Sequence, residues 1–235
     1  MIQLQRGGSD SVSWDIIFTD MKVIYAEGIG PAVRSQRFIR VLHGQLESEL
    51  NARLTDAACR EGVRVRLEAP VHGSFKDKDV DVAVIHPVNG PLLLMGVRSQ
   101  MTSVGKNVLT YTQDIIGEAV SLQDRFPMAV FAYTYLLPLH PSDTGQELNY
   151  RRYARIFSNI AGRSGATYKA ERGRYDHFAF ALVDFDTDPP SLREDLVIAA
   201  VPSVDLRLTN LVDRCIETFA ERNPWLEYFS GPPAN

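Results

Sequence analysis

Two strand-like runs joined by a short loop constrain this chain more than any other feature. Residues 79–85 and 91–100 are rich in valine, leucine and methionine, and the loop between them contains Asn89 followed by Gly90. Asparagine and glycine both tolerate positive φ, so this pair favours the tight turn of a β-hairpin. The sequence therefore predicts an antiparallel pair of strands near the middle of the chain.

The expected pairing gathers polar side chains at the open end of this hairpin. A two-residue Asn-Gly turn places Asp81 opposite Arg98 and Asp79 opposite Gln100. Because side chains alternate along a strand, these four share one face. The other face then consists of Val82, Val84, Met95 and Val97. A carboxylate placed in this way can hold Mg²⁺ beside a phosphate. Alternatively, the two aspartates are strand-entry acids paired with nearby bases, namely Lys76, Lys78 or Arg98.

The segments around the hairpin predict an α/β fold. A possible strand at residues 23–26 comes first, and a long helical pattern over residues 32–61 ends at Gly62. An alternating strand at residues 63–70 then precedes the hairpin. A helix over 104–124, with Leu109, Ile116, Ala119 and Val120 on one face, and a buried strand over 128–137 follow it. The order is helix, three strands, helix, strand.

The second half predicts α/β additions to the same domain. We expect a helix over residues 147–161, a strand buried on both faces over 177–184, and a final helix over 206–222. A chain of 235 residues fits one domain, so we expect a single domain over 1–235. It comprises a core of about 32–138 and C-terminal additions of about 139–235, with a mixed central sheet flanked by helices.

Composition excludes several classes of protein. The chain is 45% hydrophobic and 23% charged, which is typical of a globular domain. Its longest apolar stretch, residues 129–139, is too short for a membrane helix, and its start has no signal-peptide pattern. We therefore expect a cytoplasmic protein with no membrane partner. The net charge of −4 gives no overall attraction to DNA, so any DNA contact requires a local basic surface.

The run KDVDVAVIHPVNGPLLLMGVRSQ and the order of elements over residues 35–138 resemble the PD-(D/E)xK, or restriction-endonuclease-like, nuclease superfamily. In that family an aspartate on one strand and a Glu-x-Lys on the next bind Mg²⁺ and activate water. The resemblance implies that Asp81 is the aspartate and that Gln100 takes the lysine position. Arg98 then stands where the second acid is expected, and arginine cannot ligate a cation.

The missing acid has several candidates. Glu49 falls within the apolar stripe of the long helix, so it either completes the metal site or pairs with Arg53. Some family members take this acid from the helix after the hairpin, which would suggest Asp114 or Glu118. Both lie opposite the apolar face of that helix, which favours solvated charges. We therefore expect Asp81 and Glu49 to be the metal ligands.

A basic segment supplies the local charge that DNA contact would need. Between residues 151 and 174 there are seven arginines and lysines and a single acid. Three of the arginines fall on one side of a helix, and a loop with further basic residues follows, an arrangement that can straddle phosphates. A solvated helix face would explain the same run. The candidate DNA-binding residues are Lys106, Arg151, Arg152, Arg155, Arg163 and Lys169.

Other chemistry is poorly supported by the sequence. It contains no phosphate-binding loop, nucleophile elbow or HExxH motif, and its five histidines show no metal-ligand spacing. The leading hypothesis is a Mg²⁺-dependent, or Mn²⁺-dependent, DNA endonuclease of the restriction type, in which Gln100 orients water and Arg98 stabilises phosphoryl charge. The resemblance also implies a homodimer on double-stranded DNA. The alternatives are a noncatalytic nucleic-acid-binding or accessory protein with a degenerate nuclease fold, and an α/β interaction protein.

Overall fold

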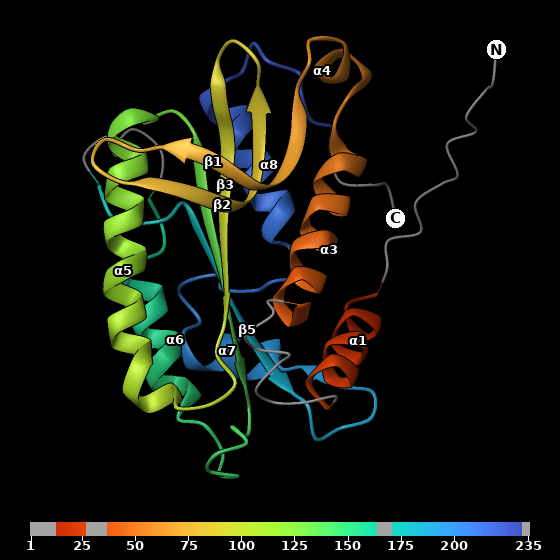
Figure 1. Ribbon diagram of the computed structural model, residues 1–235, viewed down its shortest axis with the longest axis vertical. Helices are drawn as coiled ribbons and strands as arrows, with labels where there is room; N and C mark the ends of the chain where they lie inside the picture. Colours follow the sequence, from red (N-terminus) through yellow and green to blue (C-terminus); the bar gives the residue numbers. More distant parts are fainter. Residues whose placement is uncertain (1–12, 27–36, 164–170, 232–235) are drawn as a thin grey trace, which may run out of the picture.

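A mixed six-stranded sheet forms the centre of the molecule in the computed structural model, which describes residues 13–26, 37–163 and 171–231 (Figure 1). The strands lie in chain order across the sheet. The first three are antiparallel neighbours, β3 to β5 run parallel, and β6 returns antiparallel. Their bounds are β1 Arg64–His72, β2 Asp77–His86, β3 Gly90–Ser99, β4 Val130–Pro138, β5 His177–Asp184 and β6 Ser191–Leu192.

Helices cover both faces of this sheet. On one face a buried cluster joins the sheet to four helices: α1 Trp14–Ala26, α3 Arg37–Arg53, α4 Asp56–Arg60 and α8 Leu211–Arg222. On the other face a second cluster joins it to α5 Val104–Arg125, α6 Tyr150–Asn159 and α7 Glu194–Ala200. Figure 1 shows α3 and α5 on opposite sides of the strands. All residues of β4 are buried, because helices cover both of its faces.

The order of helix, three strands, helix and strand is confirmed, and β5 spans the residues predicted for it. The predicted strand at 23–26 is wrong, because these residues end α1. The buried residues of α1 are Ile17, Phe18 and Met21, which follow helical spacing. A helix that was not predicted, α7, lies between β6 and α8.

Two predicted helices differ in detail from the observed ones. The long helix stops at Arg53, where Leu54 forms a β-bridge with Phe229, and Thr55 then caps α4 by accepting a hydrogen bond from the backbone of Ala58. The buried face of α5 is also rotated from the predicted one. It is formed by residues such as Val108 and Ile115, whereas Leu109 is 49% exposed.

The predicted hairpin exists, but its register is wrong by two residues. The turn spans residues 87–89, and the Nδ1 atom of His86 accepts hydrogen bonds from the backbone of Val88 and Asn89. In β2, a bulge between Val84 and Ile85 shifts the register of the strand pair. The observed pairs are Val84↔Leu93, Ala83↔Leu94 and Val82↔Met95. The predicted apolar face is confirmed, since Val82, Val84, Met95 and Val97 are all buried in the cluster shared with α3.

Strands β2 and β3 separate beyond the pair Val82↔Met95. From there β2 keeps its pairing with β1 as far as Asp77, while β3 continues beside β4. Figure 1 shows the β1–β2 ribbon turning away from the lower part of β3. The two strands therefore open a gap in the sheet, and Asp81 is the first residue of β2 inside it. In the described ranges, no helix is long and apolar enough to cross a membrane.

Candidate metal centre

Asp81 lies at the point where β2 and β3 diverge. One of its carboxylate oxygens, Oδ2, accepts a hydrogen bond from the backbone N–H of Val97 at 2.7 Å, which spans the gap between the strands. Burial raises the pKa of Asp81 above its usual value, against the lowering effects of this hydrogen bond and of His43 and Lys78. The side chain is still 17% exposed, so a ligand can reach it.

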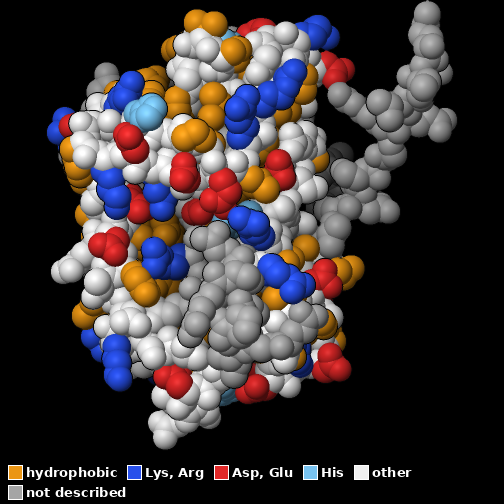
Figure 2. Space-filling view, in the orientation of Figure 1, with side chains coloured by type: hydrophobic (Ala, Val, Ile, Leu, Met, Phe, Trp, Pro, Cys, Tyr) orange, Lys and Arg blue, Asp and Glu red, His pale blue; other side chains and the backbone are white. Residues whose placement is uncertain are grey.

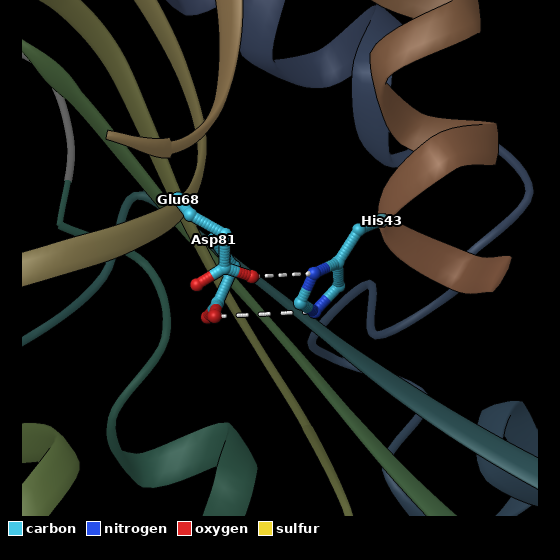
Figure 3. A group of neighbouring side chains, drawn as sticks. All are labelled: His43, Glu68 and Asp81. Atoms are coloured by element: carbon cyan, nitrogen blue, oxygen red, sulfur yellow. Dashed lines mark ion pairs between the residues drawn. The ribbon is translucent and has the colours of Figure 1, made fainter. Parts of the chain in front are cut away.

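Two further side chains meet Asp81, one from a helix and one from a strand (Figure 3). His43 projects from α3 towards both carboxylates. Its Nδ1 atom lies 3.3 Å from Oε1 of Glu68, and its Nε2 atom lies 3.9 Å from Oδ1 of Asp81. One ligand atom from each of the three residues lies within 4.8 Å of the others. The group therefore offers one imidazole and two carboxylates to a cation.

Glu68 owes its position to an irregularity in β1. It has a φ of 48°, and it lies between the residues Leu67 and Ala69, which pair with Val82 and Val80. This register places Glu68 opposite Asp81. A positive φ is rare for residues other than glycine, and such strain is found most often at functional sites. Two carboxylates facing each other across a strand pair also repel, and a bound cation would remove this repulsion.

His43 is buried beside two carboxylates but makes no well-aligned hydrogen bond to either. It is 3% exposed, and neither ring nitrogen has a hydrogen-bond partner in acceptable geometry. Burial lowers the pKa of His43 below its usual value, although Asp81 and Glu68 act in the opposite direction. This favours the neutral imidazole, which is the form that binds metals.

An open pocket of about 330 Å³ is lined by Asp81 and His43 of this group. Its other polar residues are Lys78, Arg98, Ser99 and Tyr133. The guanidinium of Arg98 lies over the ring of Tyr111, with its Cζ atom 4.1 Å from the centroid, and it interacts with the hydroxyl of Tyr133. Figure 2 shows acidic side chains gathered across the middle of this face of the molecule, with basic side chains above and below them. The pocket and the adjoining Glu68 therefore combine acids that can hold a cation with bases that can hold an anion.

The structure places the other predicted catalytic residues away from this group. Gln100 is buried, donates hydrogen bonds to the carbonyl oxygens of Thr102 and Ser103, and accepts one from the hydroxyl of Tyr135. Its side chain is thus engaged with the loop before α5. Glu49 accepts a hydrogen bond from Gln45 on its own helix at 2.9 Å.

The surroundings of Glu49 differ from those of Asp81. Burial raises the pKa of Glu49, and the charged residues that act on it are Asp213 of α8 and Arg53. The charged residues that act on Asp81 are His43, Lys78 and Glu68. A metal-binding role for Glu49 stays a prediction, and Glu68 is the carboxylate that the structure brings beside Asp81.

The two candidate acids of α5 differ in their exposure. Asp114 is exposed, as expected of a solvated charge. Glu118 was expected to be solvated too, but its side chain is only 12% exposed, and it forms ion pairs with Lys78 at 3.2 Å and Lys76 at 3.6 Å. The reason is that the buried face of α5 is rotated, so that Glu118 lies beside the buried Ile115 and Ala119.

The predicted DNA-binding residues fall into three groups. Arg151, Arg152 and Arg155 are exposed and line a shallow hollow of about 650 Å³ on α6, together with Leu109. Lys106 is exposed at the start of α5 and lines another pocket. Lys169 lies outside the described residues.

Arg163 is not available to DNA, which corrects the sequence-based prediction. It is 1% exposed, and its guanidinium donates hydrogen bonds to both carboxylate oxygens of Asp176, at 3.1 and 3.0 Å. An arginine that is buried and paired in this way is part of the protein interior and cannot contact DNA. The loop containing Arg163 was expected at the surface because of its charge, but the buried partner acid lies thirteen residues further along the chain.

Sequence reasoning missed His43 and Glu68. His43 falls within the stripe of buried residues that includes Phe38, Leu42 and Leu46, so its place on the core side of α3 could have been found from helical spacing. Glu68 carried no such signal. A second group, His140, Asp184 and Asp186, lies at the ends of β4 and β5, where Asp186 is exposed.

Comparison of the chain with protein-family models, curated proteins and solved structures gave no match.

Proposed function

We propose that this chain is a metal-dependent hydrolase of phosphodiester bonds in double-stranded DNA, acting as an endonuclease of the restriction type. The observation that carries the proposal is a pocket lined by Asp81 and His43 together with Lys78 and Arg98, with Glu68 beside the first two. Carboxylates that bind a cation beside basic side chains suit a phosphodiester, whose charge grows as water attacks it.

The residues of the site would have different roles in the reaction. The acids and the imidazole would hold a divalent cation, which polarises a phosphate oxygen and lowers the pKa of bound water. Arg98 is fixed against Tyr111 and Tyr133, so its guanidinium is oriented before a substrate arrives. Arg98 and Lys78 would bind the phosphate oxygens and stabilise the charge that develops on them.

The observed register changes how the resemblance to the PD-(D/E)xK nucleases applies. Continuing the pairing by one residue puts Gly96 opposite Asp81, so Gly96-Val97-Arg98 would take the place of Glu-x-Lys. Arg98 would then supply the positive charge of the family's lysine. The missing acid would fall at Gly96, where Tyr133 fills the space, since a Cβ atom there would lie 2.3 Å from the ring. Glu68 would provide the second carboxylate from the neighbouring strand.

A cleavage assay tests the proposal. The full chain, supplied with Mg²⁺ or Mn²⁺, should cut unmethylated phage or genomic DNA, in which many sequences are present. Asp81→Asn should lower the rate by orders of magnitude, because loss of a metal ligand removes the stabilisation of phosphoryl charge. The matched control is Asp79→Asn, an exposed acid two residues away on the same strand, which should cut normally. Equal rates in the two variants would remove Asp81 from the mechanism.

A noncatalytic DNA-binding or accessory role is the second candidate, and two observations favour it. Tyr133 fills the space of one expected acid, and the side chain of Gln100 is engaged by backbone carbonyls. DNA binding without cuts in a broad screen with both metals would select this role. A homodimer remains part of the proposal on the ground of the resemblance alone, and sedimentation of the protein with and without DNA tests it.

A further inference from the structure

We propose that His43, Glu68 and Asp81 form a mixed nitrogen and oxygen site that selects a first-row transition-metal dication, such as Zn²⁺ or Mn²⁺, over Mg²⁺. This inference deepens the proposed function, on which it rests, because it changes the metal that the pocket takes. It also differs from the expectation drawn from the sequence, in which two carboxylates alone would hold Mg²⁺.

The imidazole of His43 lacks a well-aligned hydrogen bond. The side chain is 3% exposed, and each ring nitrogen faces a carboxylate without an acceptable hydrogen-bond geometry. Buried polar groups in proteins are nearly always hydrogen-bonded, and an exception calls for an explanation. A cation bound to one ring nitrogen would give that nitrogen a partner, and the carboxylates beside the ring would enter its coordination sphere.

The separations within the group also suit one ion. Metal bonds to imidazole nitrogen and carboxylate oxygen are about 2.0–2.2 Å long, so neighbouring ligand atoms of one ion lie about 3–3.5 Å apart. One ring nitrogen of His43 and one oxygen from each acid lie within 4.8 Å of one another. Side-chain rotations that shorten these separations would bring all three ligand atoms onto one ion.

The ligand atoms of the group also favour a transition metal over Mg²⁺. Mg²⁺ prefers oxygen ligands and retains much of its water, whereas imidazole suits zinc and its neighbours in the first transition row. Three protein ligands with an open side towards a pocket are typical of a catalytic zinc site. Here the side chains of Asp81 and Glu68 are 17% and 41% exposed, so the site is open to water or a phosphate.

The second histidine and acid group is more exposed, although Nδ1 of His140 also lacks a hydrogen bond, so it serves as a comparison. The side chain of His140 is 31% exposed and that of Asp186 is 74% exposed. One carboxylate oxygen of Asp184 already accepts a hydrogen bond from the backbone N–H of Asp186, which ties it to the local turn. His140 is therefore a matched control for His43.

The experiment measures metal binding and metal ligation separately. Zn²⁺, Mn²⁺ and Mg²⁺ are titrated by calorimetry into the wild type, His43→Gln and His140→Gln. The wild type and His140→Gln should bind Zn²⁺ most tightly and Mg²⁺ most weakly. His43→Gln should weaken Zn²⁺ binding by at least about tenfold and leave Mg²⁺ binding nearly unchanged, because only the imidazole is lost. In pulsed EPR of the Mn²⁺-loaded protein, the imidazole nitrogen signal should vanish in His43→Gln alone.

Several outcomes would overturn this inference. These are Mg²⁺ binding as tight as Zn²⁺ binding in the wild type, unchanged Zn²⁺ affinity in His43→Gln, or no imidazole signal from the wild type. If His43→Gln does not fold, Glu68→Gln replaces it, since this side chain is 41% exposed. Glu68→Gln should weaken Zn²⁺ binding while keeping the imidazole signal, and unchanged binding in this variant would also count against the site.

The inference and the proposed function can fail independently. Selective Zn²⁺ binding through His43 without DNA cleavage would support the metal site and contradict the nuclease. Cleavage that depends on Asp81, together with Mg²⁺ binding that equals Zn²⁺ binding, would support the nuclease and contradict the selectivity.

Discussion

His177 is a buried titratable residue whose charge state affects the free energy of unfolding. It begins β5, and its Nε2 atom lies 2.8 Å from the hydroxyl of Thr218 on α8. Burial, assisted by the charge of Arg214, lowers the pKa of His177 from 6.5 to about 4. Between these two pH values the unfolded chain binds a proton that the folded protein does not, so acid favours unfolding.

We therefore predict that neutral His177 stabilises the fold fully above about pH 6.5, and that this contribution falls as the pH decreases towards 4. At about pH 5 the loss should be about 2 kcal/mol relative to neutral pH. Urea unfolding of the wild type and of His177→Gln at both pH values measures this loss in the free energy of unfolding. The variant should lose less stability on acidification, because glutamine does not titrate. Parallel losses in the two proteins would show that His177 is not responsible.

At the scale of elements, α6 presents one apolar and one basic side. Asn149 caps the helix by accepting a hydrogen bond from the backbone of Arg152. Tyr153 and Phe157 are buried against the sheet, which leaves Arg151 and Arg155 on the exposed side. A helix held rigidly in this way keeps the spacing of its arginines, as binding to successive phosphates requires.

We predict that these arginines bind DNA phosphates. Replacing all three of Arg151, Arg152 and Arg155 by alanine should weaken DNA binding. It should also lower the slope of log affinity against log salt concentration by up to about three, because each arginine that pairs with a phosphate contributes about one. Arg60→Ala, an exposed arginine on α4, is the control and should leave the slope unchanged. The measurement is fluorescence anisotropy of duplex DNA over a range of salt concentrations. A slope that the triple substitution does not change would assign these residues to a solvated surface.

At the scale of the whole molecule, Asp176 joins distant parts of the chain. Its carboxylate accepts hydrogen bonds from Arg163, from Arg222 at the end of α8, and from the backbone N–H of Phe131 in β4. The side chains of Asp176 and Arg163 are 0% and 1% exposed, so the pair is shielded from water. Because three segments of the chain bind this one carboxylate, its loss should lower the stability of the whole fold.

We predict that Asp176→Asn destabilises the protein by about 3–5 kcal/mol, because it leaves buried arginine charge without compensation. The control is Asp195→Asn. Asp195 makes a similar two-bond contact with Arg193 at the surface, where the side chain is 62% exposed. Exposed pairs contribute about 0–1 kcal/mol. Urea unfolding measures both variants, and similar losses would mean that burial of the Asp176 network has little effect.

Local sequence patterns were sufficient to predict most of the helices and strands of this protein. The strand β5 lies where a run of apolar residues predicted a strand buried on both faces, and the helix α5 lies where helical spacing predicted it. These patterns also predicted that Asp81 lies on a hairpin strand with an apolar opposite face. These are properties of neighbouring residues, which local spacing can reveal.

Which side chains lie beside Asp81 depends on how the elements pack against one another. The hairpin register depends on the hydrogen bonds of His86 in the turn and on the bulge after Val84, and neither follows from alternation. The approach of His43 depends on how α3 packs on the sheet, and that of Glu68 depends on one residue with positive φ. Convergence of side chains from a helix and two strands is a property of packing, strand twist and strand separation, and no local pattern in the chain encodes it.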